Sequence, residues 1–198
     1  MGKIKQFVQT YINQLTDLLS QIEPNLIEQL INLLESTKAN EGRVYILGNG
    51  GSAATASHMV NDLGAGLRRR NIINFDITSL ADNTPVCSAI SNDVGYENIF
   101  YLQLKGLLKP QDLIIAISCS GNSPNIVKAV KYANKINAKI IGCTGFNGGY
   151  LKNNCDINFH IDAPDEEYGL VEDMHMILDH IIYSYYIQQG KEKGIIYD

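Results

Sequence analysis

Apolar residues near the N-terminus recur every three to four positions, as they do on one face of a helix. This spacing predicts a helix over Ile4–Ile22. A second helix is predicted to begin at Pro24, because proline suits the first turn of a helix. We expect both helices, within residues 1–40, to pack on the core and on partner subunits.

From Val44 onward, short apolar runs alternate with helical patterns. Strands are predicted at Val44–Leu47, Asn71–Leu80, Asp112–Ser118, Ala138–Cys143 and Asp156–Ile161. Helices are predicted at about Ser52–Leu67, Tyr96–Leu107, Ser123–Ile136 and Leu170–Gln189. Alternation of this kind predicts right-handed crossovers and an α/β fold, in which helices cover both faces of a parallel sheet. The run Asp112–Ser118 is apolar enough to be a central strand. We expect residues 1–198 to form a single domain.

The composition and charge of the chain argue against nucleic-acid and membrane partners. The 198 residues carry a net charge of −5, and Arg68–Arg70 is the one tight basic run. A nucleic-acid partner is therefore not expected. No apolar run approaches the roughly 18 residues that a membrane span needs, and the N-terminus does not resemble a signal peptide. The four cysteines form no CxxC pair. We expect a cytoplasmic protein with reduced thiols and no membrane partner.

Two loops that follow predicted strands have the character of phosphate-binding loops. In Gly48–Ser52, glycines would let backbone N–H groups approach a ligand at a helix N-terminus. The alternative is a tight turn in which Ser52 caps the helix. In Ser118–Ser123, Ser123 before a proline is typical of an N-cap, but the other two serines are not needed for capping. Parallel strands end at one sheet edge, where ligands bind, so the two loops together indicate a phosphate site.

A dinucleotide site is the competing interpretation of the first loop. Gly48, Gly50 and Ala53 fit the relaxed dinucleotide-binding fingerprint. That fingerprint requires an acid at the end of the second strand, whereas Asp76 falls in the middle of its predicted strand. It also leaves the serine loop unexplained, so we favour the phosphate interpretation.

Ionisable residues recur on two predicted helices. His58 and Asp62 are four residues apart and share a helix face, so they can present two ligands to one metal. Alternatively, they form a buried histidine bonded to a neighbouring carboxylate. The closing helix carries five ionisable residues among apolar ones: Glu172, Asp173, His175, Asp179 and His180. Glu172 and His180 are separated by about 12 Å of helix rise. Both could contact one ion only if Glu172 reached forward along the helix.

Together these motifs resemble the phosphoheptose isomerase family of the SIS-domain superfamily. The residues that carry the resemblance are Gly48-Asn49-Gly50-Gly51-Ser52, His58 with Asp62, Ser91-Asn92-Asp93-x-Gly95-Tyr96-Glu97, Ser118-x-Ser120-Gly121-Asn122-Ser123, Thr144-Gly145 with Gly148-Gly149, and His175 with His180. They occur in family order over nearly the whole chain. Each motif alone is weak, but the combination is specific.

The resemblance implies a flavodoxin-like three-layer sandwich with a five-stranded parallel sheet and extra N-terminal helices. It implies a homotetramer whose active sites are completed across subunit interfaces. The implied reaction is the reversible conversion of sedoheptulose 7-phosphate to D-glycero-D-manno-heptose 7-phosphate, which supplies heptose for lipopolysaccharide or capsule. The sugar phosphate would be bound by Asn49, Gly50, Gly51, Ser52, Asn92, Asp93, Ser118, Cys119, Ser120, Asn122 and Ser123.

The resemblance also implies one Zn²⁺ per active site, with His58, Asp62, Glu172 and His180 as ligands. In the isomerisation, Asp62 or Glu172 would take the proton and His180 would assist on the opposite side of the substrate. The chain departs from the family pattern in three places. Asp62 and Glu172 replace a usual Glu and a usual Gln, and Gly169 replaces an acid.

These departures put the exact sugar phosphate in question. Another class of function is also open, because some SIS-domain proteins are non-catalytic sugar-phosphate sensors or associate with a replication initiator. Gly51 and the late histidines His175 and His180 favour an isomerase.

Overall fold

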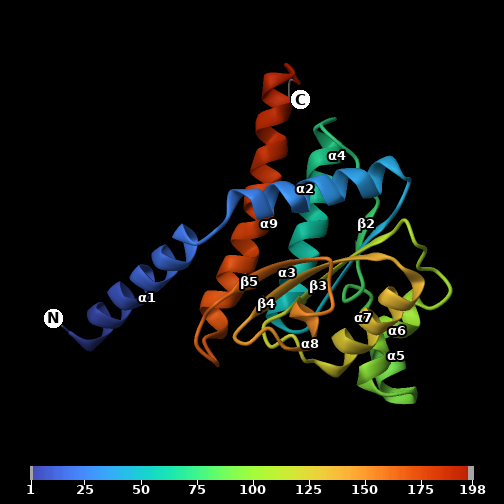
Figure 1. Cartoon of the computed structure of the whole chain (residues 1–198), viewed down its shortest axis with the longest axis horizontal. Coiled ribbons are helices and arrows are strands. Elements are labelled where there is room, and N and C mark those ends of the chain that lie inside the picture. The colour runs from blue at the N-terminus through green and yellow to red at the C-terminus, as the bar shows by residue number, and fades with distance from the viewer. Residues whose placement is uncertain (1, 196–198) are drawn as a thin grey trace.

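A five-stranded, fully parallel sheet forms the centre of the computed structural model, which describes residues 2–195 (Figure 1). The strands are β1 (Val44–Gly48), β2 (Ile77–Ser79), β3 (Leu113–Ser118), β4 (Lys139–Gly145) and β5 (Ile157–Ile161). Their order is β2-β1-β3-β4-β5, which is the flavodoxin-like order. The predicted α/β fold is confirmed, and β3 is central as expected.

Helices cover both faces of the sheet. They are α1 (Lys3–Ser20), α2 (Pro24–Ala39), α3 (Gly51–Met59), α4 (Leu67–Arg69), α5 (Thr84–Asp93), α6 (Ile99–Leu104), α7 (Pro124–Ile136), α8 (Gly149–Lys152) and α9 (Tyr168–Glu192). Side chains alternate along a strand, so Val44 and Ile46 of β1 join the core under α2, α3 and α9. Tyr45 and Leu47 join the core under α6 and α7 on the opposite face. The result is a three-layer sandwich.

The edge of the sheet differs from the prediction. The predicted strand Asn71–Leu80 is reduced to Ile77–Ser79, because only these three residues pair with β1. Asp76 therefore lies just before the strand and not in its middle. Its carboxylate accepts a hydrogen bond from Arg43 Nε at 2.8 Å. The short helices α5 and α8 were also not predicted, and the predicted helix Tyr96–Leu107 begins as a 3₁₀ turn over Tyr96–Asn98.

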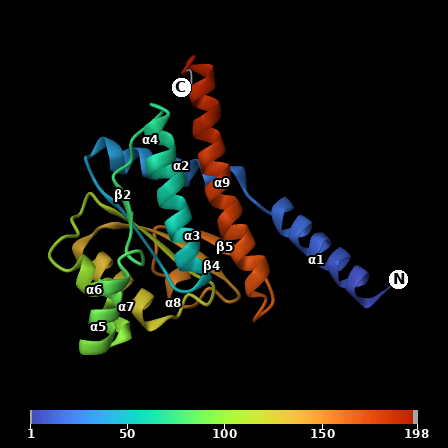
Figure 2. The ribbon, with the colours of Figure 1, turned by 180° about the vertical axis from the view of Figure 1, so that it is seen from behind.

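The helix α1 extends away from the body of the molecule, as Figures 1 and 2 both show. Its buried residue is Leu18. The other apolar residues of its stripe are largely exposed: Ile4, Phe7, Val8, Ile12 and Leu19. Tyr11 links the helix to α9, because its hydroxyl donates to Asp173 Oδ2 at 2.7 Å. Among the described residues, no helix combines the length and apolar content needed to cross a membrane.

Candidate active site and metal cluster

The glycine loop after β1 and the serine loop after β3 line one cavity of about 160 Å³. Both strands end at the same sheet edge, which is where ligands bind in open parallel sheets. The lining residues are Asn49, Ser52, Ile117, Ser118, Cys119, Ser120, Ser123, Tyr168 and Glu172. The cavity therefore combines several hydroxyl groups with one carboxylate.

The serine hydroxyls of this cavity remain able to donate to a ligand. Ser118 Oγ accepts a hydrogen bond from the backbone N–H of Gly121 at 3.2 Å, and Ser120 Oγ accepts from that of Asn122 at 3.3 Å. A hydroxyl donates independently of what it accepts, so both keep an O–H for a phosphate oxygen. Ser123 occupies the N-cap position of α7 without a side-chain capping bond. Its hydroxyl is thus available as well.

The glycines beside the serine loop are explained by close packing. Gly121 has a φ of +64°, and a Cβ there would overlap the carbonyl oxygen of Gly148. The loop that carries Gly148 and Gly149 lies directly against the serine loop. Asn122 strengthens this contact, because its Oδ1 accepts from the backbone N–H of Tyr150 at 2.8 Å. Asn122 therefore shapes the loop and does not line the cavity.

Asn49 is held in place at the cavity by two neighbours. Its side-chain amide exchanges a reciprocal pair of hydrogen bonds with Asn125, at 3.0 and 2.8 Å. The hydroxyl of Tyr96 also donates to Asn49 Oδ1 at 2.9 Å. A side chain fixed in this way can orient a substrate hydroxyl with little loss of conformational freedom.

Glu172 enters the cavity from α9 and lies against the start of α3. A Cβ at Gly51 would overlap the Glu172 carboxylate, so this glycine leaves the space that the carboxylate occupies. The first amides of a helix are unpaired and favour a negative charge. The α3 N-cap is Gly50, with a φ of +52°, and Ser52 lies inside the helix and is buried. The capping interpretation of Ser52 is therefore wrong.

Cys119 lies in the same cavity as a protonated thiol. Burial and the nearby negative charge of Glu172 raise its pKa to about 11, and a hydrogen bond with Ser52 opposes the shift only in part. A thiol in this state is a poor nucleophile. Cys119 thus contributes shape and a weak polar contact to the cavity.

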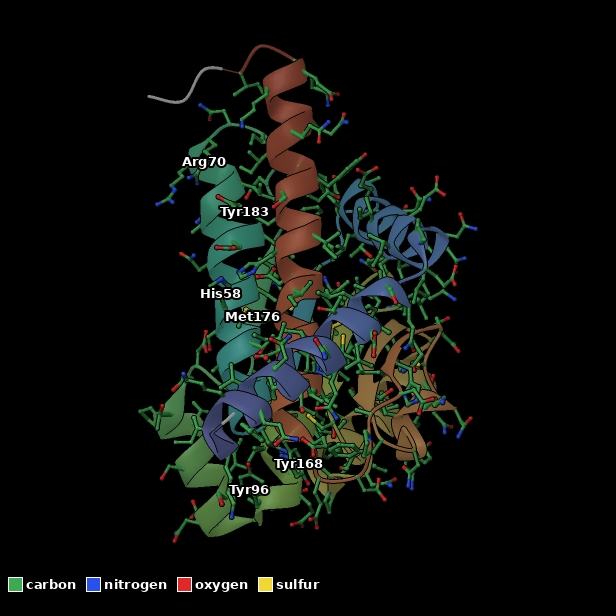
Figure 3. The ribbon with its side chains drawn as sticks, turned by 90° about the vertical axis from the view of Figure 1, so that its left-hand side faces the viewer. His58, Arg70, Tyr96, Tyr168, Met176 and Tyr183 are labelled. Carbon is green, nitrogen blue, oxygen red and sulfur yellow. The ribbon has the colours of Figure 1, made fainter. Side chains whose placement is uncertain are left out.

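A second cluster of ionisable side chains forms where α3 and its continuation pack against α9 (Figure 3). Its members are His58, Asp62, Asp179 and His180, and one possible ligand atom from each lies within 4.8 Å of the others. The His58 Nε2 atom is 3.2 Å from His180 Nε2 and 3.5 Å from Asp62 Oδ2. Paired imidazole and carboxylate groups of this kind suit a divalent transition metal.

A π-helical segment, Val60–Gly66, continues α3 and carries Asp62 into this cluster. Such segments are rare and occur frequently at functional sites. The side chain of Asp62 is held by Asn61, whose Nδ2 donates to Asp62 Oδ1 at 2.8 Å. The sequence predicted one regular helix here and gave no sign of the π segment.

Comparisons with known proteins show the family to which this chain belongs. The model of the SIS domain family matches residues 10–145. The phosphoheptose isomerase of Aliarcobacter butzleri is 35% identical over 79% of this chain and 81% of its own length. That of Geotalea daltonii is 31% identical over 91% of this chain and 92% of its own length. The solved phosphoheptose isomerase from Neisseria gonorrhoeae superimposes with a TM-score of 0.82 at 25% identity, over 94% and 97% of the two chains.

This chain belongs to the phosphoheptose isomerase family. The resemblance inferred from the sequence is thereby confirmed. The family is one of isomerases. The hydroxyl-lined cavity lies at the sheet edge where β1 and β3 end, as the sequence predicted. Six of the predicted sugar-phosphate residues line that cavity: Asn49, Ser52, Ser118, Cys119, Ser120 and Ser123. Gly50 is the N-cap of α3, and Gly51 leaves space for the Glu172 carboxylate that lines the cavity.

Two further residues that the phosphoheptose isomerase resemblance assigned to substrate lie outside the cavity lining. Asn92 and Asp93 end α5, where Asn92 Nδ2 donates to Asp93 Oδ1 at 2.8 Å. Tyr96, a few residues later, is the member of this segment that reaches the site, through Asn49.

The metal ligands implied by phosphoheptose isomerase membership divide into two groups. His58, Asp62 and His180 belong to the cluster between α3 and α9. Glu172 lines the cavity and is not part of that cluster. Asp179 is the additional member that sequence reasoning did not select. The sequence feature that could have identified Asp179 is its position within the apolar run Met176–Ile182, immediately before His180.

Asp179 is completely buried, and its carboxylate oxygens have no hydrogen-bond partner among the described residues. Burial, together with the charge of Asp62, raises the pKa of this carboxyl group to about 7. His175, the other buried ionisable residue of α9, is structural. Its Nε2 lies 3.4 Å from the carbonyl oxygen of Thr144, and burial lowers its pKa to about 4, so the ring is neutral.

Proposed function

We propose that this protein catalyses the reversible isomerisation of sedoheptulose 7-phosphate to D-glycero-D-manno-heptose 7-phosphate. The observation that carries the proposal is the cavity in which the hydroxyls of Ser118, Ser120 and Ser123 share one space with the Glu172 carboxylate. Its relatives are named phosphoheptose isomerases, and these names supply the substrate. We place the protein in the cytoplasm, because its four cysteines are free, as is usual in a reducing compartment.

The serine loop binds the phosphate end of the sugar. Three hydroxyls and the N-terminal amides of α7 supply donors to the phosphate oxygens without a lysine. Asn49, held by Asn125 and Tyr96, orients a sugar hydroxyl. With the remote phosphate fixed, the reacting carbons are positioned for proton transfer.

Isomerisation moves a proton between adjacent carbons through an enediol. A base removes the proton from the carbon beside the carbonyl group, and an acid protonates the carbonyl oxygen. Asp62 and Glu172 are the two carboxylates that can serve as the base. They differ in position, since Glu172 contacts the cavity and Asp62 contacts the histidine cluster. His180 assists the proton transfer from the opposite side of the substrate.

We propose one Zn²⁺ per active site, held by His58, Asp62 and His180. The donor set supports this, because two imidazole nitrogens 3.2 Å apart beside a carboxylate are suited to sharing a cation. When bound, the ion would supply Lewis-acid polarisation of the carbonyl group. His58 is partly exposed and His180 is exposed, so the cluster is open to solvent on one side.

We also propose a homotetramer with active sites at subunit interfaces. The exposed apolar residues of α1 support this, since Phe7 is 69% exposed and Ile12 is 50% exposed. Apolar surface on a helix that extends from the body usually marks a contact between chains. Tyr96 and Tyr168 beside the cavity are exposed too, and a neighbouring subunit could cover them.

Incubation of the purified protein with sedoheptulose 7-phosphate tests the proposal. We expect the aldoheptose 7-phosphate to form until the two sugars reach equilibrium. Fructose 6-phosphate serves as the control ketose phosphate and should be converted far more slowly. Saturable binding of sedoheptulose 7-phosphate without any product would indicate a non-catalytic sugar-phosphate sensor instead.

A further inference from the structure

Asp179 is the one member of the histidine–carboxylate cluster whose surroundings leave it without a structural role. Its side chain is 0% exposed, and both of its oxygens lack hydrogen-bond partners among the described residues. Burying a carboxylate without a partner is costly, so buried charges are normally paired or coordinate metals. The nearest cationic candidate is His58, whose Nε2 is 3.8 Å away.

The contacts of His58 indicate whether Asp179 is positioned to orient a histidine or to bind a metal ion. Asp62, Asp179 and His180 all approach the same atom, the Nε2 of His58. A carboxylate that only orients a metal-binding histidine bonds to the ring nitrogen that does not bind the metal. Because Asp179 shares the His58 Nε2 with the other candidate ligands, its position is that of a ligand.

The charge of the cluster and the positions of its carboxylates also indicate that Asp179 binds a cation. When both aspartates of the cluster are ionised they carry a charge of about −2, which a divalent cation would neutralise. Asp62 is a short carboxylate, and Glu172 lies at Gly51 near the other end of the same helix face. Asp179 approaches from the buried side of the cluster, while His180 is on the exposed side.

We propose that Asp179 is a direct ligand of the divalent metal ion, completing a site of two histidines and two aspartates with His58, Asp62 and His180. The inference rests on the metal dependence proposed above. In this ligand set Asp179 takes the place of Glu172, whose carboxylate lines the sugar-phosphate cavity instead. Asp179 compensates for the short side chain of Asp62 by adding a second carboxylate.

Zn²⁺ titration of chelated protein by calorimetry tests the ligand set. We expect Asp179→Asn and Asp179→Leu to weaken Zn²⁺ binding at least tenfold, while Glu172→Gln binds like the wild type. Asp173→Asn is the matched control, because Asp173 is on the same helix and bonds to Tyr11. Metal-free Asp179→Leu should melt at a higher temperature than metal-free wild type, since a buried unpaired carboxylate is removed. That result excludes unfolding as the cause of weaker binding.

Cobalt spectroscopy separates a ligand from a residue that acts through His58. In Asp179→Cys, bound Co²⁺ should show a thiolate-to-metal charge-transfer band that wild type and Asp173→Cys lack. Absence of the band, or wild-type Zn²⁺ affinity in both Asp179→Asn and Asp179→Leu, would overturn the inference. If the wild-type protein itself fails to bind Zn²⁺ or Co²⁺, the proposed metal dependence fails, and this inference fails with it.

Discussion

The Nε2 atoms of His58 and His180 lie 3.2 Å apart, although 122 positions separate the two residues in the chain. Their rings meet edge to face, with centroids 5.2 Å apart. One ring comes from α3 and the other from α9, and the packing of these helices alone brings them together (Figure 3). This relationship makes a metal site testable by single substitutions.

Removal of either histidine should abolish the metal response. We expect Zn²⁺ to raise the isomerase activity of chelated wild-type protein, and His58→Ala and His180→Ala to show no such rise. His160→Gln is the control, because His160 contacts Thr144 on the sheet and should respond like the wild type. Full activity of the chelated protein, with wild-type turnover in both alanine variants, would show that the histidines are structural.

Substitution of Ser123 should impair substrate binding without affecting stability. A hydrogen bond to a charged group contributes about 1.5–3 kcal/mol, so Ser123→Ala should raise KM by about tenfold or more. Its hydroxyl makes no capping bond, so the melting temperature should stay unchanged.

Asn83→Ala provides the contrast to the Ser123 variant. Asn83 Oδ1 caps α5 by accepting from the backbone N–H of Val86 at 3.2 Å. Losing such a cap costs about 1 kcal/mol, which corresponds to roughly 2–4 °C in a chain of this size. A loss of stability in Ser123→Ala, with unchanged KM, would mean that Ser123 only caps α7.

Two amide substitutions identify the catalytic base. Loss of a general base lowers kcat about 10²–10⁴-fold, so Asp62→Asn or Glu172→Gln should show a loss of this size. If Asp62 is the base, Glu172→Gln retains most of its activity, because glutamine is the usual family residue at that position. Comparable losses in both variants would contradict a single base. Because Asp62 is also a proposed Zn²⁺ ligand, steady-state kinetics at a Zn²⁺ concentration that saturates each variant provide the measurement.

The buried ring of His175 predicts a loss of stability in acid. Burial lowers its pKa from 6.5 to about 4, so between these pH values the unfolded chain binds a proton that the folded chain excludes. The stability contributed by the neutral ring is present above pH 6.5 and is lost as the pH falls toward about 4. The loss amounts to up to about 3 kcal/mol.

Urea unfolding of wild type and His175→Gln at several pH values measures this effect. The difference between their unfolding free energies should change across the window from pH 6.5 to 4 and stay constant above it. A difference that is flat from pH 4 to 7 would show that His175 titrates alike in both states.

The apolar face of α1 predicts that its substitution changes the oligomeric state. Phe7→Asp and Ile12→Asp place charges on exposed apolar positions and should reduce the mass measured by light scattering below that of a tetramer. Gln6→Asp adds the same charge on the opposite face of this helix and should leave the tetramer intact. A wild-type protein that is monomeric at micromolar concentration would contradict the proposed assembly.

The predictable part of the fold was the part specified by local patterns. The runs of β1, β3 and β4 are almost continuously buried because these inner strands are covered on both faces, and their positions were predicted to within a few residues. The edge strand β2 was mispredicted, because its length depends on how much of it β1 can pair with. Short helices such as α5 have too few turns to show a periodic pattern.

The candidate site divides in a similar way. The two strand-end loops could be predicted from the sequence, because a strand, its terminal glycines or serines and the following helix are contiguous, and parallel strands bring such loops to one edge. It also identified His58 with Asp62, since four-residue spacing defines one helix face.

The assignment of α9 residues to the cavity or to the metal cluster depends on helix packing, which the sequence pattern does not show. Along one helix, Glu172 and His180 look like candidates for a shared ion, but Glu172 lies against Gly51 while His180 faces His58. Asp179 was one of five ionisable residues noted on the closing helix, and the packing of α3 against α9 encloses it without a hydrogen-bond partner among the described residues. Burial and the approach of distant side chains depend on how helices pack, and no local pattern specifies that packing.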